Sequence, residues 1–353
     1  MPKRYGNLWE RFVAEDNCIL AEKTMAKNKS DNRMARYIGE HADYYGKAMH
    51  EKLVSGEYTF SIPRETDIND SYKGKTRHLQ IPCLEDQAVM QAWLNIATPY
   101  IERVNYFYNC GSIPKAGQTR AVNGLKRMLG RAKPPKWAAV TDIRKFYETC
   151  PHKVVIAGLR RLFKDEKFID VAARMMDSMS NTGVGLAIGY PVSHWFANVA
   201  LMYLDLQLRR EFPDVLHFRY MDDTVFVSRN KRHLRKALKY YIEKVRRRGM
   251  TVKRNWQVFP IKKRGITFLS YRFFPGYTLL TKPLMYRIAR KMKRAAANMT
   301  VHAAQGVMSY IGILKHCDSH NFMVSRVYPY IIPKKCRKVI SIAAKKNLLC
   351  SAA

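Results

Sequence analysis

The chain has 353 residues, of which 47% are hydrophobic, so it predicts a folded protein of two or three subdomains and excludes a disordered chain. Lys and Arg number 63 against 28 Asp and Glu, a formal net charge of +35 that destabilises a compact chain by self-repulsion unless a polyanion offsets it. Nucleic acid is the simplest such partner, ahead of an anionic membrane surface or a ribosomal-type structural role.

No run of about 18 apolar residues is present, so the sequence predicts no transmembrane helix, and the first residues lack the apolar core of a signal peptide. The seven cysteines are widely and irregularly spaced, which favours neither a disulfide framework nor a zinc-binding CxxC pair. We therefore expect reduced thiols, a cytoplasmic location and no membrane partner.

The first 60 or so residues carry apolar side chains at helical spacing, which we interpret as the core faces of helices. Segment 73–82 then alternates basic and apolar residues and predicts a turn that enters a strand. From the residues alone, that strand is interpreted as a solvated edge guarded by lysines. Helices are predicted next at 84–97 and, after a turn-rich loop at 108–118, at 119–131.

An apolar run at 137–141 predicts a short strand that ends on Asp142. Helices are expected at 152–163 and 167–179. A glycine-rich segment at 182–194 leads into a further helix at 195–210, and its glycines would let the backbone approach a ligand closely.

Two runs rich in β-formers, at 216–220 and 224–228, predict a hairpin with Asp222 and Asp223 at its tip. Adjacent carboxylates repel each other unless a cation lies between them, and hard divalent cations prefer such oxygen ligands. A solvated Asp-Asp turn is the simpler interpretation of the pair alone. Asp142, at the end of another predicted strand, could converge with the pair and hold two metal ions for phosphoryl transfer.

These segments together resemble the reverse transcriptases. Tyr220-Met221-Asp222-Asp223 resembles motif C of that family, and Asp142 with Tyr147 five residues later resembles motif A. The resemblance implies an α+β, right-hand polymerase fold with an antiparallel palm sheet flanked by helices and a helical thumb. It divides the chain into fingers at 1–135, with an N-terminal helical extension, a palm at 136–275 and a thumb at 276–353.

The resemblance also implies an RNA-directed DNA polymerase that uses two Mg²⁺ ions, for which Mn²⁺ can substitute. Asp142, Asp222 and the backbone oxygen of Ile143 would coordinate the metals, with Asp223 as a weaker ligand or a nearby charge. Template RNA, the RNA–cDNA duplex and dNTPs would be the partners. After a basic helix at 231–248, Lys253 or Arg254 would donate a proton to the leaving pyrophosphate, as motif D does.

Further binding residues follow from the family's other motifs. By resemblance, the incoming nucleotide would contact the basic strand, the aromatic of motif A and the glycine-rich motif B, namely Lys75, Arg77, Tyr147, Ile188, Gly189 and Ser193. Tyr147 would exclude a 2′-hydroxyl. The primer end would be gripped by motif E, which comprises Phe268, Leu269, Ser270 and Tyr271. The duplex would contact one face of a basic helix, which carries Arg287, Arg290, Lys291 and Arg294.

Motif B indicates the subtype, because most reverse transcriptases have Pro-Gln-Gly-x-x-x-Ser-Pro there. The pattern Ile188-Gly189-x-x-x-Ser193-His194 is similar to the Ile-Gly-x-x-x-Ser-Gln of diversity-generating retroelements, with His194 in place of Gln. Likewise Ser270 replaces the usual Gly of motif E. This subtype implies a dedicated template RNA, errors at template adenines and a basic helical-bundle accessory protein. The alternatives are a defence-associated or retron-type enzyme and, from another class, a non-catalytic RNA-binding protein on a polymerase scaffold.

Overall fold

The computed structural model describes residues 4–351 except 28, 30, 71–74 and 115, and for 70, 75 and 345–351 it describes the backbone alone. Its helices are α1 (Trp9–Val13), α2 (Glu15–Ala26), α3 (Arg33–Glu40), α4 (Ala42–Ser55), α5 (Leu84–Val104), α6 (Gly117–Leu129), α7 (Phe146–Thr149), α8 (His152–Leu162), α9 (Glu166–Met179), α10 (Ser193–Glu211), α11 (Lys231–Arg247), α12 (Ile261–Arg264), α13 (Lys282–Ala297), α14 (Val301–Leu314), α15 (His320–Arg326) and α16 (Pro333–Ser351). Its strands are β1 (Arg64–Asp70), β2 (Lys75–Ile81), β3 (Trp137–Thr141), β4 (Leu216–Tyr220), β5 (Asp223–Ser228), β6 (Val258–Pro260), β7 (Ile266–Phe268), β8 (Tyr271–Phe274) and β9 (Tyr277–Leu280).

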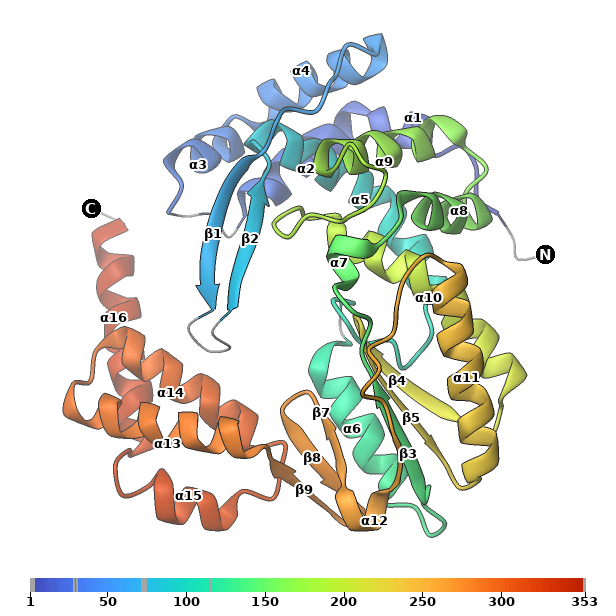
Figure 1. Ribbon diagram of the computed structural model, residues 1–353. Helices are drawn as coiled ribbons and strands as arrows, with labels where there is room; N and C mark the ends of the chain where they lie inside the picture. Colours follow the sequence, from blue (N-terminus) through green and yellow to red (C-terminus); the bar gives the residue numbers. More distant parts are fainter. Residues whose placement is uncertain (1–3, 28, 30, 71–74, 115, 352–353) are drawn as a thin grey trace.

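The N-terminal helices form as predicted; α1 and α2 pack on the long helix α5, and α3 and α4 pack on α2. Leu8 and Phe12, two of the apolar side chains at helical spacing in this region, are fully buried. Helices α2 and α4 approach closely because position 46 is glycine: a Cβ atom there would lie 2.6 Å from Cγ1 of Ile19. The β1–β2 ribbon projects from this helical layer (Figure 1).

An antiparallel sheet in the order β4-β5-β3-β6 lies at the centre of the fold. Alternating side chains along its strands point to opposite faces. Ala139 and Phe226 join one hydrophobic core with α5 and α8–α11, whereas Ala138 and Val225 join a second core with α6, β7–β9 and the C-terminal helices. Helices α10 and α11 accordingly cover one face of the sheet and α6 covers the other (Figure 1).

Helix α11 shows why these segments form these elements. Its core face, Leu234, Leu238, Tyr241 and Val245, repeats at helical spacing and is buried. The helix begins at Lys231 because Oδ1 of Asn230 accepts a hydrogen bond from the backbone N–H of Arg232 at 2.9 Å. The basic residues between these positions remain on the solvent side.

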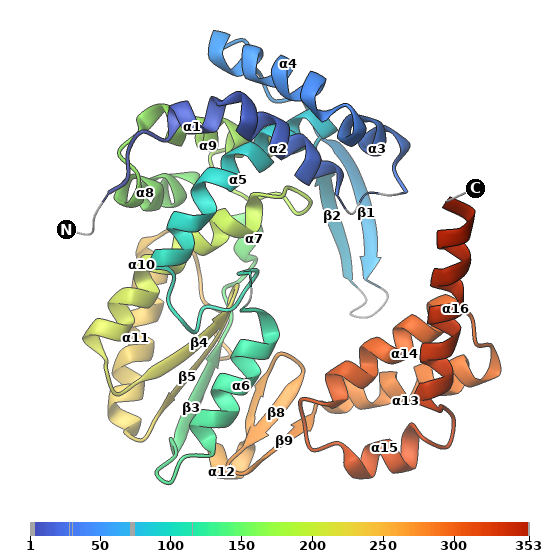
Figure 2. The same cartoon turned by 180° about the vertical axis from the view of Figure 1, so that it is seen from behind.

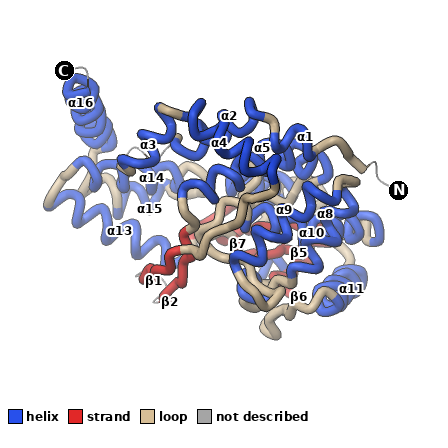
Figure 3. Tube along the Cα trace, turned by 90° about the horizontal axis from the view of Figure 1, so that it is seen from above, coloured by secondary structure: helices blue, strands red, loops and turns tan. Residues whose placement is uncertain are grey.

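The C-terminal part is a layer of helices joined to the main body through the small sheet β7-β8-β9. Helices α13, α14 and α16 pack on one another, and the chain ends at α16, far from the N-terminus (Figures 2 and 3).

The expected α+β class, with an antiparallel sheet flanked by helices and a helical C-terminal part, is confirmed. The division at 135 and 275 stays a proposal; α6, placed in the fingers by that division, packs against β4. Within the described residues, no helix has the length and apolarity needed to cross a membrane. The cysteines whose side chains are described, Cys18, Cys83, Cys110, Cys150, Cys317 and Cys336, are free thiols.

Candidate active site

The three carboxylates singled out in the sequence lie at one end of the four-stranded sheet. Thr141, the last residue of β3, pairs with Thr224 of β5. Asp142 directly follows β3 and Asp223 begins β5, so the antiparallel register brings their backbones to the same level. Asp222 lies in the adjoining turn. The metal-binding roles of the three side chains stay a prediction.

The turn that carries Asp222 is tight and strained. Tyr220 pairs with Asp223, so Met221 and Asp222 alone make the turn. Met221 has a φ of 56°, in the left-handed region, which costs a residue with a side chain about 1–2 kcal/mol. Behind it lies Gly111, where a Cβ atom would stand 2.5 Å from the Met221 nitrogen. Glycine at that position lets the loop before α6 support the turn.

One of the two lysine or arginine candidates for motif D contacts Asp142. The ammonium of Lys253 donates to Oδ2 of Asp142 at 2.5 Å, and its backbone N–H donates to the Asp142 carbonyl at 2.9 Å. This segment runs antiparallel to the end of β3, where Ile143 bridges Val252. Arg254 is exposed. The structure therefore brings Lys253 to Asp142.

The oxygen atoms at this end of the sheet suit a hard divalent cation. Oδ1 of Asp142 is buried and has no hydrogen-bond partner among the described residues. The backbone hydrogen bonds to the segment around Val252 come from the residues before and after Ile143. The Ile143 carbonyl therefore points to the opposite edge of its strand, away from this pairing. Carboxylate and carbonyl oxygens are the ligands that Mg²⁺ prefers.

The carboxylates do not form a ready-made metal cage. Across the described part of the chain, no three or more His, Cys, Asp or Glu side chains are grouped so as to hold a metal ion. The ammonium of Lys253 supplies the positive charge at Asp142 instead. A metal bound by Asp142 through both oxygens would have to replace this lysine.

Tyr147, on the short helix α7, lies against the same turn. Its hydroxyl is 3.8 Å from the sulfur of Met221. Burial raises the pKa of Tyr147 to about 12, and the negative charge of Asp222 adds to the effect. The phenol is therefore neutral at physiological pH and adjoins the carboxylate turn, and its contact with the nucleotide sugar stays a prediction.

The β1–β2 ribbon and the glycine-rich loop meet through their backbones. Gln80 of β2 donates to the carbonyl of Ile188 at 2.9 Å. Gly189 has a φ of 119°, and a Cβ atom there would lie 2.3 Å from the Gln80 oxygen, so a side chain is excluded. Arg77 is exposed on the same strand. Lys75 begins β2, with only its backbone described, and the predicted turn at 73–74 lies outside the described residues.

Ser193, the third motif B residue predicted to contact nucleotide, is the first residue of α10 and is buried. Its hydroxyl is 3.6 Å from the sulfur of Met179, so it presents no exposed group in this conformation. Ile188, in contrast, is 38% exposed. Burial lowers the pKa of His194, so this departure from the family pattern is uncharged at neutral pH.

The predicted motif E forms a hairpin between β7 and β8. Phe268 pairs with Tyr271, and Leu269 and Ser270 make the turn with φ values of 50° and 69°. Both aromatic side chains are buried, and the Tyr271 hydroxyl donates to the carbonyl of Ile313 in α14 at 3.0 Å. This tight turn with apolar anchors also connects the sheet to the C-terminal helices.

The basic residues predicted to contact the duplex all lie on α13, but they differ in exposure. Arg290 and Arg294 are exposed, whereas Arg287 and Lys291 are half-buried. The stem of Lys291 passes Gly306 of α14, where a Cβ atom would lie 3.0 Å from its Cε. Arg290 and Arg294 are thus the two that present their charge to a ligand most directly.

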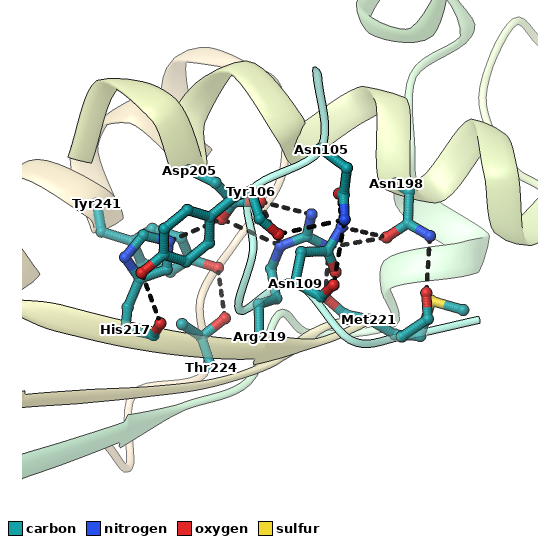
Figure 4. Close-up of polar contacts among 11 residues, drawn as sticks. Asn105, Tyr106, Asn109, Asn198, Asp205, His217, Arg219, Met221, Thr224 and Tyr241 are labelled. Atoms are coloured by element: carbon teal, nitrogen blue, oxygen red, sulfur yellow. Dashed lines mark hydrogen bonds and ion pairs between the residues drawn. The ribbon is translucent and has the colours of Figure 1, made fainter. Parts of the chain in front are cut away.

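Sequence reasoning missed a buried polar network directly behind the carboxylate turn (Figure 4). It is centred on Arg219 of β4, which is fully buried and paired with the buried Asp205 of α10. One signal was available: an arginine between Phe218 and Tyr220, inside a strand of β-formers, requires a buried partner. Nothing in the spacing identified Asp205 as that partner.

The comparisons with known proteins agree with these motifs. A family model described as "Reverse transcriptase (RNA-dependent DNA polymerase)" matches residues 63–273, well over half of the chain. Protein YkfC of Escherichia coli strain K12 is 26% identical over 224 residues, which are 60% of this chain and 54% of that protein. The chain thus spans about half the length of this curated relative.

Among solved structures, the chain is similar to apo telomerase from Candida tropicalis, with a TM-score of 0.47 and 13% identity over 61% of this chain and 47% of that one. For Candida tropicalis telomerase in complex with a fragment of telomeric RNA, the TM-score is 0.48 and the identity 11%, over 80% of this chain and 60% of that one. The family match spans the strand of Arg77, the three carboxylates, the glycine-rich loop and the β7–β8 hairpin. The chain therefore belongs to the reverse transcriptase family.

Proposed function

We propose that this chain is an RNA-directed DNA polymerase that copies an RNA template into cDNA from dNTPs. The observation that carries the proposal is the register of β3 with β5, which brings Asp142, Asp223 and the turn at Asp222 to one end of one sheet. A binding protein without catalytic activity has no need of three carboxylates at one site, because each repels the others and the nucleic acid alike.

Two Mg²⁺ ions, or Mn²⁺ in their place, would supply activation of the primer 3′-hydroxyl and neutralisation of the triphosphate. Asp142, Asp222 and the carbonyl of Ile143 would hold them, with Asp223 as a weaker ligand or a nearby charge. The buried Oδ1 of Asp142, which has no hydrogen-bond partner among the residues that the structure describes, supports this assignment.

The chain's own side chains have distinct tasks in this proposal. Lys253 neutralises Asp142 in the structure and, once released, would place an ammonium where the leaving pyrophosphate needs a proton. Arg77, with Lys75, would bind the triphosphate, since a guanidinium matches phosphate geometry. Tyr147 would contact the sugar. Arg290 and Arg294 would contact duplex phosphates, which bind without regard to sequence.

Primer extension on a primed RNA with Mg²⁺ and dNTPs tests the activity. Wild-type protein should extend the primer, and Asp222→Asn should lower the rate by at least about 10²-fold because charge stabilisation at the reacting phosphate is lost. Asp170→Asn, which removes an exposed carboxylate paired with Arg174 on α9, is the matched control and should retain activity. Folded wild-type protein that incorporates no nucleotide would refute the proposal.

For the subtype, we propose the error-prone enzyme of a diversity-generating retroelement, acting with a dedicated template RNA and a basic helical-bundle accessory protein. The proposal rests on Ile188, which replaces the family's usual Gln and is exposed in a loop bound to the strand of Arg77. Sequencing of cDNA made on a defined template should show errors concentrated at template adenines, and Ile188→Gln should reduce them. Errors spread evenly over the four template bases would favour a defence-associated or retron-type enzyme.

A further inference from the structure

Arg219 lies directly behind the carboxylate turn and is entirely buried. Its guanidinium donates to both carboxylate oxygens of Asp205, with Nη2 to Oδ2 at 2.6 Å and Nε to Oδ1 at 3.1 Å. His217, two residues earlier on the same face of β4, adds a contact to Oδ1 of Asp205 at 3.2 Å. A buried charge pair of this kind is weak evidence for stability, because desolvation of both ions offsets most of their attraction.

The remaining guanidinium nitrogen points at the turn (Figure 4). Nη1 of Arg219 donates to the carbonyl of Met221 at 3.1 Å and lies 3.3 Å from Oδ1 of Asn198. Met221 is the residue with the left-handed φ, and its carbonyl belongs to the peptide that connects it to Asp222. The arginine therefore holds the peptide unit whose orientation sets the direction of the Asp222 side chain.

Asn198 extends this contact to the loop on the other side of the turn. Its Nδ2 donates to the carbonyl of Gly111 at 2.8 Å, and its Oδ1 accepts from Asn109 at 3.0 Å. Gly111 in turn lies against the Met221 nitrogen. Met221 is thus held from both sides, by Arg219 at its carbonyl oxygen and by the close approach of Gly111 at its backbone nitrogen.

We propose that Arg219, fixed by Asp205 and Asn198, is a positioning residue that sets the orientation of the Met221–Asp222 peptide and so of the Asp222 carboxylate. This inference rests on the proposed polymerase function, in which Asp222 binds metal. The burial of two ions is then explained by geometry: a guanidinium can donate to Asp205 in a fork and still offer a nitrogen to the turn. Loss of such partners behind a metal ligand typically costs about 10–100-fold in metal affinity or activity.

The decisive variant is the double substitution Asp205→Leu with Arg219→Met. It removes both buried charges together, so neither is left unpaired, and it also removes the hydrogen bond to the Met221 carbonyl. Gly111→Ala is the second variant, because it displaces the Met221 nitrogen without touching any charge. Tyr241→Phe is the control: it deletes a buried hydroxyl on the same face of the sheet, 3.5 Å from Thr224, and leaves the hydrogen bonds of Arg219 to Asp205 and Met221 in place.

Each protein is assayed for kcat and the apparent KM for Mg²⁺ in primer extension, for Mn²⁺ binding by electron paramagnetic resonance without nucleotide, and for duplex binding by fluorescence anisotropy. Circular dichroism checks folding. Both turn variants should lose about 10–100-fold in Mn²⁺ affinity or kcat, with a raised KM for Mg²⁺ and unchanged duplex affinity. Tyr241→Phe should match wild type in all of these.

A folded double variant with wild-type kcat, Mg²⁺ dependence and Mn²⁺ affinity would overturn the positioning role, as would equal losses in Tyr241→Phe. Wild-type protein that is folded but inactive would refute the proposed function instead. In that case Mn²⁺ binding still decides the inference, because equal affinities in wild type and both turn variants would overturn it.

Discussion

Two hairpin turns in this protein contain non-glycine residues with positive φ, and they are stabilised in different ways. The β4–β5 turn places Met221 in the left-handed region, and the β7–β8 turn places Leu269 and Ser270 there. Glycine is the usual residue for such positions, because a side chain costs about 1–2 kcal/mol. Neither turn contains a glycine, so the surrounding structure has to keep each one in place.

The support behind the two turns is of opposite character. Behind Met221 lies a buried charge pair, and the guanidinium of Arg219 bonds directly to the turn carbonyl. Beside Leu269 and Ser270 the anchors are the buried aromatic rings of Phe268 and Tyr271. Apolar anchors hold a turn in place without burying a charge, but they do not fix the rotation of its peptide units. A hydrogen bond to a carbonyl, in contrast, fixes the orientation of one peptide unit. The more costly support occurs where a carboxylate has to point in one direction.

The largest expected effect comes from breaking the polar support on one side only. Arg219→Met leaves the Asp205 carboxylate buried without its guanidinium and should lower the free energy of unfolding by about 3–5 kcal/mol. Tyr271→Phe, which removes only the hydroxyl contact to Ile313 from the apolar support, should cost about 1 kcal/mol. Urea denaturation measures both. Equal losses in the two variants would remove the contrast between the turns.

The second largest effect should be on the pH dependence of stability, because only the polar support behind Met221 contains a carboxylate. Burial alone raises the pKa of Asp205, but the charge of Arg219 and the His217 hydrogen bond outweigh it and hold the pKa below the ordinary 3.8. Because the folded pKa is the lower one, the Asp205 contribution to stability is complete above pH 3.8 and is lost as the pH falls through the folded value.

The comparison protein for this measurement is the double variant Asp205→Leu with Arg219→Met, which shares every other carboxylate with wild type. Below about pH 4 its free energy of unfolding should fall less steeply with acid than that of wild type. Parallel curves for the two proteins would show that the pair contributes nothing that depends on the charge of Asp205.

The smallest expected effect is an increase in stability. Ser270→Gly should raise the free energy of unfolding by about 0.5–1 kcal/mol, since glycine accepts the left-handed conformation that this turn type requires. Met221→Gly relieves the same strain but loses the side chain that contacts Tyr147, so it should reduce polymerase activity. Thermal unfolding and primer extension on both variants test this difference, and a fully active Met221→Gly enzyme would contradict it.

Much of the fold follows from local patterns in the chain. The runs rich in β-formers at 216–220 and 224–228 became β4 and β5, and the helical stripe after Asn230 became α11, because strand propensity and helix capping are short-range effects. The placement of Asp222 in a hairpin turn follows from those two strands alone. The apolar run at 137–141 likewise predicted the strand that ends at Asp142, and the resemblance to motif A added support for its convergence with the hairpin, but the spacing alone could not pair the strands.

Tertiary structure alone decided how the site is held. The contact of Lys253 with Asp142, the approach of Gly111 to Met221 and the pairing of Arg219 with Asp205 each join segments that lie apart in the chain. Such contacts depend on which helix covers which face of the sheet, a choice that packing of the whole core makes. The sequence by itself determined where the carboxylates stand; packing determined what stands behind them, because hydrogen bonds and buried charges are fixed by distances that no local pattern encodes.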